Sequence, residues 1–220
     1  RGRVRFEEMT MVNGREFKGA GLDLPKCLSA TLTNCAFLVN LIPNTYPTNS
    51  WGGGVSAVNG RLSVAGCEFR GNGYSDYSSS WGGGLYALNA DIVVMNSLFE
   101  TNFLGVNSGA YGMGMYLSGG SALISGCAFA TNISKKGYNH QGGALCASGV
   151  NPLTISNCTF VGNYLNAFNG PVLGGALYIA GCKPLVIARC TFKENKLASN
   201  ISREGGAMYL TGATLEGSIS

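Results

Sequence analysis

Two short motifs alternate along this chain with one shared period, and this repeat restricts the fold more than any other feature. The first motif is Cys-x-Phe-x-x-Asn, as in residues 158–163, and the second is Gly-Gly-x-apolar-x-apolar, as in residues 174–179. Successive copies of the asparagine lie 32, 30, 30, 31 and 32 residues apart, and successive copies of the first glycine lie 30, 30, 30, 32 and 31 residues apart. A period of this length is typical of solenoids and other repeat arrays.

Each repeat contains three segments that we expect to be short strands. The segment before the cysteine alternates apolar and polar residues, as at Leu62 and Val64, which is the pattern of a half-buried strand. Cys-x-Phe places two apolar side chains on one face, and the segment after Gly-Gly does the same, for example with Leu85 and Ala87. Three strands in each coil of about 30 residues predict an all-β parallel β-helix with a coil spacing of about 4.8 Å.

Equivalent side chains of stacked coils should form ladders along the helix axis. We expect a core ladder of phenylalanines at Phe37, Phe69, Phe99, Phe129, Phe160 and Phe192. We expect an amide ladder at a corner, with each side chain hydrogen-bonded to its neighbours, at Asn40, Asn72, Asn102, Asn132, Asn163 and Asn195. Asparagine also tolerates the left-handed backbone that a corner can require.

The whole chain, residues 1–220, is predicted to be one β-helix segment of about seven coils. Residues 1–26 form a degenerate first coil, residues 27–212 the regular coils, and residues 213–220 a truncated last coil. The chain does not begin with Met, and it stops within the repeat pattern. We therefore expect a fragment of a longer protein, so that targeting segments would lie outside it.

The composition argues against several function classes. Charged residues make up 12% of the chain, and the net charge is +4 without a dense basic run. We therefore expect no nucleic-acid partner. Apolar runs are too short to cross a bilayer, so we expect no transmembrane segment in this fragment.

The segments between the asparagine and Gly-Gly vary from coil to coil and lie on one edge of the stack. Insertions on one face of a repeat protein often form its binding face. Trp51 and Trp81 share a register and should stack, either to cap the edge of the core or to offer a platform for sugar rings or a partner protein. The candidate contact residues on this edge are Trp51, Trp81, Tyr46, Tyr77, Tyr111 and Tyr138.

The pairing of Phe-x-x-Asn with Gly-Gly-Ala-[Ile/Leu/Val] resembles the repeats of the chlamydial polymorphic outer membrane proteins. Similar repeats occur in bacterial and algal surface proteins with a pectin-lyase-like, right-handed parallel β-helix. The resemblance extends from Cys35 to Leu210, although the second motif is Gly-Gly-Gly at Gly52 and Gly82 and Gly-Met-Gly at Gly112. It implies an extracellular, passenger-like stalk that is often adhesive, and it does not imply one particular activity.

Five of the eight cysteines share one register, at Cys35, Cys67, Cys127, Cys158 and Cys190. Their parallel Cβ vectors favour stacked free thiols, while their Cα spacing also allows disulfides, so both states stay open. Cys146 should point outward between Tyr116 and Tyr178, either as an intermolecular thiol or as a tolerated surface thiol. Because the chain has no Cys-x-x-Cys pair and one histidine, we expect no metal site.

Catalysis by this fold on acidic polysaccharides would require clustered carboxylates. The three aspartates, Asp23, Asp76 and Asp91, belong to distant coils. Glu68, Glu100 and Glu194 take outward positions that suit a solvated surface, and His140 is expected in a loop with no carboxylate close in sequence. We therefore expect no catalytic residues and no cofactor.

One sequon is a plausible glycosylation site. Asn200-Ile201-Ser202 falls in a predicted loop, so Asn200 is the candidate acceptor if the protein is secreted by a eukaryote. The sequon at Asn132 belongs to the amide ladder, and the sequon at Asn157 precedes a buried cysteine. Both are therefore poor acceptors.

The sequence predicts a non-enzymatic extracellular structural protein, a rigid rod of a cell-surface fibre, appendage or wall layer. Its partners would be further copies of itself or other surface proteins. The alternative is an adhesin whose aromatic edge binds glycans or proteins of a host or neighbouring cell. A relative of the polysaccharide lyases is the third hypothesis.

Overall fold

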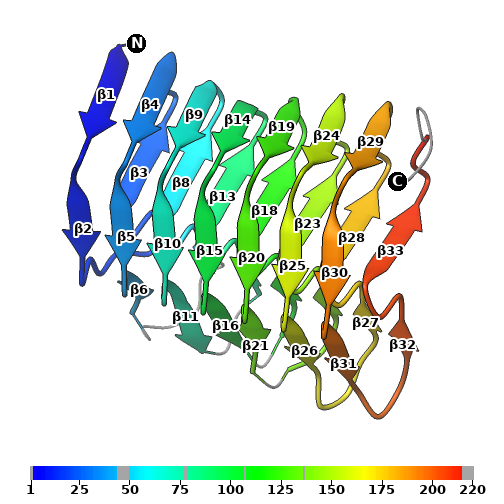
Figure 1. Cartoon of the computed structure of the whole chain (residues 1–220). Coiled ribbons are helices and arrows are strands. Elements are labelled where there is room, and N and C mark those ends of the chain that lie inside the picture. Colours follow the sequence, from blue (N-terminus) through cyan, green and yellow to red (C-terminus); the bar gives the residue numbers. More distant parts are fainter. Residues whose placement is uncertain (1, 44–49, 77–78, 107, 136, 215–220) are drawn as a thin grey trace.

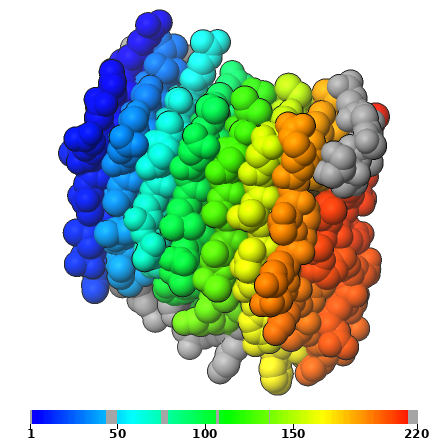
Figure 2. Space-filling model, in the orientation of Figure 1, coloured from blue at the N-terminus to red at the C-terminus, as the bar shows by residue number. Residues whose placement is uncertain are grey.

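The computed structural model describes residues 2–43, 50–76, 79–106, 108–135 and 137–214. In these residues the regular elements are all β-strands, and they form five parallel sheets that run side by side along one axis (Figure 1). We name them sheets I to V in the order in which the chain visits them within a coil. In Figure 2 the coils form successive bands of colour, so they stack in chain order.

Sheets I and II hold the two strands that precede and follow the cysteine position of each coil. Sheet I contains β1 (Arg3–Glu7), β4 (Ser29–Thr33), β9 (Arg61–Ala65), β14 (Asp91–Met95), β19 (Ala122–Ser125), β24 (Leu153–Ser156) and β29 (Leu185–Ala188). Sheet II contains β2 (Thr10–Val12), β5 (Ala36–Leu38), β10 (Glu68–Arg70), β15 (Leu98–Glu100), β20 (Ala128–Ala130), β25 (Thr159–Val161) and β30 (Thr191–Lys193).

Sheet V holds the third predicted strand, which follows the Gly-Gly motif. Its strands are β3 (Leu22–Pro25), β8 (Val55–Val58), β13 (Leu85–Leu88), β18 (Met115–Ser118), β23 (Leu145–Ser148), β28 (Leu177–Ala180) and β33 (Met208–Thr211). The first coil, although its sequence is degenerate, pairs in the same register as the later ones, since β1, β2 and β3 hydrogen-bond to β4, β5 and β8.

The structure adds two short strands to most coils, in the segments that the sequence analysis expected to be loops. Sheet III contains β6 (Leu41–Ile42), β11 (Gly73–Asp76), β16 (Phe103–Val106), β21 (Ile133–Ser134), β26 (Tyr164–Asn166) and β31 (Lys196–Ala198). Sheet IV contains β7 (Ser50–Trp51), β12 (Ser80–Trp81), β17 (Ala110–Tyr111), β22 (His140–Gln141), β27 (Val172–Leu173) and β32 (Arg203–Glu204).

The main core is enclosed by sheets I, II and V. Inward residues such as Leu62, Phe69 and Leu85 are almost completely buried there. Neighbouring rings of the predicted phenylalanine ladder stack with centroids 4.5 to 5.0 Å apart, from Phe37 to Phe192. The core of this lobe is therefore built from the residues that the repeat keeps constant.

A second, smaller core lies between sheets III and IV. It contains Ile42, Tyr74, Leu104, Ala110, Met113, Leu165, Ala167 and Val172. Only one side chain of each two-residue strand points inward, and its identity changes from coil to coil. This lobe explains why the segments do not behave as loops, because most of them bury one side chain against its neighbours above and below, apolar as at Leu104 or polar as at Ser134.

The asparagine ladder is confirmed at a corner, between the strands of sheets II and III, and its side chains point into the interior. Asn72 is fully buried, and its Nδ2 donates to Asn102 Oδ1 at 3.1 Å and to the Phe37 carbonyl at 2.7 Å. A Cβ added at Gly84 would lie 3.1 Å from the Phe99 ring and 3.3 Å from Asn102. The amides thus separate the two cores, against the closely packed glycine backbone.

The left-handed backbone conformation falls beside the ladder asparagines and not on them. The residue before each asparagine has a positive φ, for example 53° at Thr101 and 51° at Thr131. The chain turns again at the first glycine of the second motif, where Gly82 has a φ of 62° and an added Cβ would collide with the Leu85 carbonyl. That position therefore requires glycine.

All eight cysteines are free thiols, so the structure has the stacked arrangement of the cysteine ladder and no disulfides. Ser97 continues the ladder, and its Oγ accepts a hydrogen bond from the Cys67 backbone N–H at 3.1 Å. The thiols of Cys67 and Cys127 donate to backbone carbonyls of their own and neighbouring coils. They act as small buried side chains with satisfied weak donors.

Candidate binding surface

Five aromatic side chains gather where the outer faces of sheets IV and V meet, and we call them the aromatic strip. Trp51, Trp81 and Tyr111 are consecutive in sheet IV, and Tyr86 and Tyr116 are consecutive in sheet V. The opposite side chains of these strands, such as Ser80 and Leu85, point into the two cores. Alternation along short strands therefore places the strip outside.

Rings from sheets IV and V contact each other, so they fill the angle between the outer faces of the two sheets. Trp51 stacks on Tyr86 with centroids 5.7 Å apart, and Tyr86 stacks on Tyr116 at 5.6 Å. Trp81 stacks on Tyr111 at 5.7 Å and meets Tyr116 edge to face at 6.4 Å. The two indoles are neighbours in the ladder, but each ring stacks on a tyrosine instead of on the other indole, because sheet V approaches from the side.

The strip is partly buried and electrically neutral. Burial raises the pKa of Tyr116 to about 12 and also raises the pKa values of Tyr86 and Tyr111. The hydroxyl groups are therefore protonated at neutral pH and can donate hydrogen bonds. Lys18 adds a cation above the Trp51 ring, with Nζ 4.5 Å from the ring centroid. Such a surface can stack on apolar faces and hydrogen-bond their polar edges.

Not all predicted contact residues belong to the strip. Trp51, Trp81 and Tyr111 do, whereas Tyr138 is half exposed on a loop between sheets III and IV, at another edge of the molecule. Tyr46 and Tyr77 lie outside the described residues. The outward row predicted around Cys146 contains Tyr116 and extends to Tyr86. The sequence analysis did not count these tyrosines as contacts, because it did not include sheet IV beside them.

Cys146 was predicted to be a surface thiol, and this exposure is wrong. Cys146 does lie between Tyr116 and Tyr178 in sheet V, but it is only 1% exposed. It occupies the same outer row as the tyrosines of the strip, close enough to Tyr111, Tyr116 and Tyr178 to affect their pKa values, and a thiol is too short to reach past these rings. Burial raises its pKa far above the usual range, so this thiol is protected from disulfide exchange.

A shallow depression of about 560 Å³ lies on the outer face of sheet I. Its lining includes Thr31, Arg61, Ser63, Asp91, Val93 and Leu123. Asp91 Oδ1 accepts a hydrogen bond from Ser121 Oγ at 2.8 Å, and Arg61 lies 3.9 Å from the same carboxylate. The alternation of short polar residues in sheet I was the sequence signal for this surface, which the sequence analysis did not identify as a candidate site.

The glutamates that were predicted to be solvated surface residues take part in ion pairs. Arg70 Nε lies 2.6 Å from Glu68 and 3.0 Å from Glu100 on the outer face of sheet II. Lys193 lies 3.6 Å from Glu194. In the described part of the chain, no three His, Cys, Asp or Glu side chains are grouped in a way that could hold a metal ion.

His140 is buried and not in a loop as predicted. It belongs to β22, and its Nδ1 lies 2.6 Å from Ser134 Oγ in the second core. Burial lowers its pKa to about 4, against a weaker opposite effect of the Ser108 backbone. Its Nε2 has no hydrogen-bond partner among the described residues. A neutral, buried imidazole of this kind is a structural group with a sensitivity to acid.

The predicted glycosylation residue is accessible. Asn200 is exposed in a bend between β31 and β32, as expected. Asn132 is fully buried in the amide ladder, which makes it a poor acceptor, as also expected. The described strands and turns include no helix with the length and apolar character that a membrane crossing requires.

Comparison with known proteins agrees with the coil geometry. The model of the family described as "Right handed beta helix region" matches residues 74–218. Neither the curated proteins nor the solved structures include one that matches the chain. The family match, together with about seven coils of parallel strands, confirms the predicted fold class. The chain therefore belongs to the right-handed β-helix family.

Proposed function

We propose that this chain is a rigid, non-enzymatic rod segment of an extracellular structural protein in a cell-surface fibre, appendage or wall layer. The carrying observation is the unbroken pair of ladders, from Phe37 to Phe192 and from Asn40 to Asn195, that joins successive coils through the interior. Bending the rod would separate stacked rings and buried hydrogen bonds on one side, so these ladders favour stiffness.

The surface location is supported by the sequence motifs. Phe-x-x-Asn is intact in six coils, and Gly-Gly-Ala is intact at Gly142, Gly174 and Gly205, a pairing that resembles the polymorphic outer membrane protein repeats. The partners of such a rod would be further copies of it or other surface proteins.

The non-enzymatic part of the proposal is supported by the arrangement of the carboxylates. Glu68 and Glu100 both form ion pairs with Arg70 on sheet II, while Asp91 is paired on sheet I. Acid–base cleavage of a glycosidic bond needs two carboxyl groups on either side of one substrate. Incubation of the chain with a panel of polyuronates should release no unsaturated product, and such a product would instead support the lyase hypothesis.

The rod proposal is tested by electron microscopy of the intact parent protein with and without reductant. We expect straight rods or filaments that do not change on reduction, because Cys146, the predicted intermolecular thiol, is buried. Compact particles would contradict the proposal. Protease or antibody access to the protein on intact source cells tests the extracellular location, and a signal only after lysis would refute it.

A second candidate, adhesion, is favoured by the partial exposure of Trp51, Trp81 and Tyr111 in the aromatic strip. Indole and phenol rings are preferred surfaces for sugar rings and for protein hot spots. A glycan array should then give a signal that Trp51→Ala or Trp81→Ala reduces about tenfold or more. The matched control is Val93→Ser on sheet I, and an equal loss with this variant would rule out the strip.

A further inference from the structure

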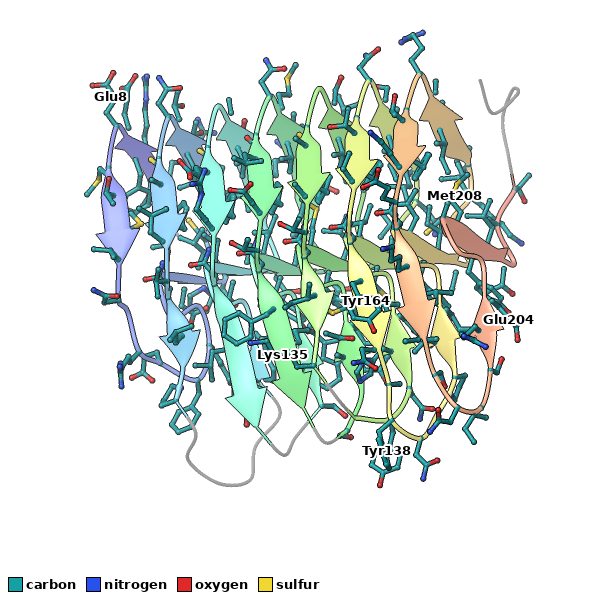
Figure 3. All side chains as sticks on the ribbon, turned by 60° about the horizontal axis from the view of Figure 1, so that its bottom comes forward. Glu8, Lys135, Tyr138, Tyr164, Glu204 and Met208 are labelled. Carbon is teal, nitrogen blue, oxygen red and sulfur yellow. The ribbon has the colours of Figure 1, made fainter. Side chains whose placement is uncertain are left out.

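A row of exposed apolar side chains runs along the loops that join sheets III and IV, and we call it the loop-tip ridge. Tyr138, Phe168 and Ile201 lie between β21 and β22, β26 and β27, and β31 and β32 of three successive coils. They are 50%, 69% and 65% exposed, and Phe168 and Ile201 are the most exposed large apolar residues in the described part of the chain. Figure 3 looks onto this side, where Tyr138 projects at the lower edge.

The ridge is held by contacts between coils. The Phe168 N–H donates to the Gly137 carbonyl at 2.9 Å, and the Tyr138 N–H donates to the Ser108 carbonyl at 3.0 Å. Ser199 Oγ donates to the Gly170 carbonyl and accepts from the Ile201 N–H. The loop backbones that carry the tips are thus held in place before any partner binds, which reduces the ordering cost of binding.

Half-exposed apolar residues continue from the ridge onto the outer face of sheet III. Phe103, Ile133 and Tyr164 lie in one row there, and Lys196 follows Tyr164 in the next coil. Lys135 Nζ lies 5.0 Å from the centroid of the Phe103 ring. Figure 3 shows Lys135 and Tyr164 on the same face, above Tyr138.

The charges around the ridge are mostly basic. Within residues 133–140, 164–172 and 196–204 the sequence has Lys135, Lys136, Lys196 and Arg203 against one acidic residue, Glu204. Lys135, Lys196 and Arg203 are exposed. An apolar ridge with cations beside it is complementary to a surface that is apolar inside and anionic at its boundary.

We propose that the loop-tip ridge lays the β-helix on an anionic lipid bilayer, with Phe168 and Ile201 entering the interface and the lysines meeting the headgroups. The three tips project from loops of successive coils that are about 4.8 Å apart, so one flat surface can meet all three. This role goes beyond the rod function and is independent of it.

The test is co-sedimentation of the chain with vesicles of phosphatidylcholine alone or mixed with phosphatidylserine. We expect binding to the mixed vesicles that weakens as salt increases. Phe168→Ser/Ile201→Ser should reduce the partition coefficient about a hundredfold, because each side chain contributes about tenfold when buried. The matched control, Val12→Ser/Leu123→Ser, removes exposed apolar residues from sheets II and I and should bind normally.

A charge variant separates the electrostatic contribution to vesicle binding from the apolar one. Lys135→Glu/Lys196→Glu should lose at least about tenfold in binding to the phosphatidylserine vesicles and little in binding to neutral ones. These positions are exposed, and thermal unfolding of each variant verifies that the fold is intact.

Three outcomes would overturn the proposal. The chain could fail to bind either vesicle, or Phe168→Ser/Ile201→Ser could bind as tightly as the parent. The third is concentration-dependent self-association without lipid that the same variant abolishes, which would make the ridge a contact with a second copy. All three leave the rod proposal unaffected, since electron microscopy tests that separately.

Discussion

The two cores of this β-helix are built on different principles. The main core, between sheets I, II and V, keeps an apolar residue at almost every inward position and repeats one residue type in sheet II, as in the stacked rings of Phe99 and Phe129. The second core, between sheets III and IV, uses strands of two to four residues with a different side chain at each level, and it includes the polar pair Ser134 and His140. Repetition thus supplies stability in one lobe, while the other tolerates variation.

The largest effect should come from a cavity in the main core. Phe129 is fully buried and stacks on Phe99 and Phe160, so Phe129→Ala should lower the free energy of unfolding by about 3–5 kcal/mol. The matched control is Phe168→Ala at the exposed ridge, which should change it by less than about 0.5 kcal/mol. Chemical denaturation followed by circular dichroism measures both, and similar losses in the two variants would mean that the phenylalanine row is not the core.

Acid should weaken the second lobe first. His140 has a pKa of about 4 in the folded chain, below its ordinary value of 6.5, so folding is favoured by its neutral form. Its contribution is therefore fully present above about pH 6.5 and decreases as the pH falls toward 4, by about 3 kcal/mol in total. Hydrogen exchange should show the earliest loss of protection in β21 and β22.

The matched variant for this acid effect is His140→Val, since Val172 occupies the same position in the next coil. The Ser134 hydroxyl keeps a partner in this variant, because it accepts from the Asn166 N–H at 2.9 Å. The unfolding free energy of the variant should depend less on pH between about 6.5 and 4. Parallel pH curves for the two proteins would show that His140 does not carry the effect.

The smallest effect should come from the outer face of the main lobe. Glu100 and Arg70 are 3.0 Å apart, but their side chains are 32% and 50% exposed. Glu100→Gln should therefore cost less than about 1 kcal/mol, and about 1 M salt should remove the difference. If Glu100→Gln lowered the free energy of unfolding as much as Phe129→Ala, surface ion pairs would contribute as much to stability as the repeated core.

The sequence predicted the main lobe well and the second lobe poorly. Phe37 and Asn40 have equivalents in the five coils that follow, and the Gly-Gly motif departs from its pattern only at Gly112, so the register and the ladders could be predicted from spacing alone. The strands of sheets III and IV could not, because Ile42, Tyr74 and Ser134 share a position without sharing a chemical type. Alternation of apolar and polar residues can be recognised only over several residues, and a strand of two residues is too short for it.

The candidate site shows what followed from not predicting sheets III and IV. Alternation correctly placed Tyr116 and Cys146 on the outer face of sheet V. The burial of Cys146 and the stacking of Trp51 on Tyr86 depend on sheet IV, which spacing did not predict. Outward-facing and solvent-exposed are therefore different properties in a solenoid whose sheets meet at a closed angle.

The buried amide ladder has a direction. Each side chain, from Asn40 to Asn163, donates from Nδ2 to the Oδ1 of the asparagine in the following coil. The amide dipoles therefore point the same way and polarise one another along the axis. A further coil with the same asparagine would extend this directional ladder, and the rod would lengthen by one whole step of about 4.8 Å.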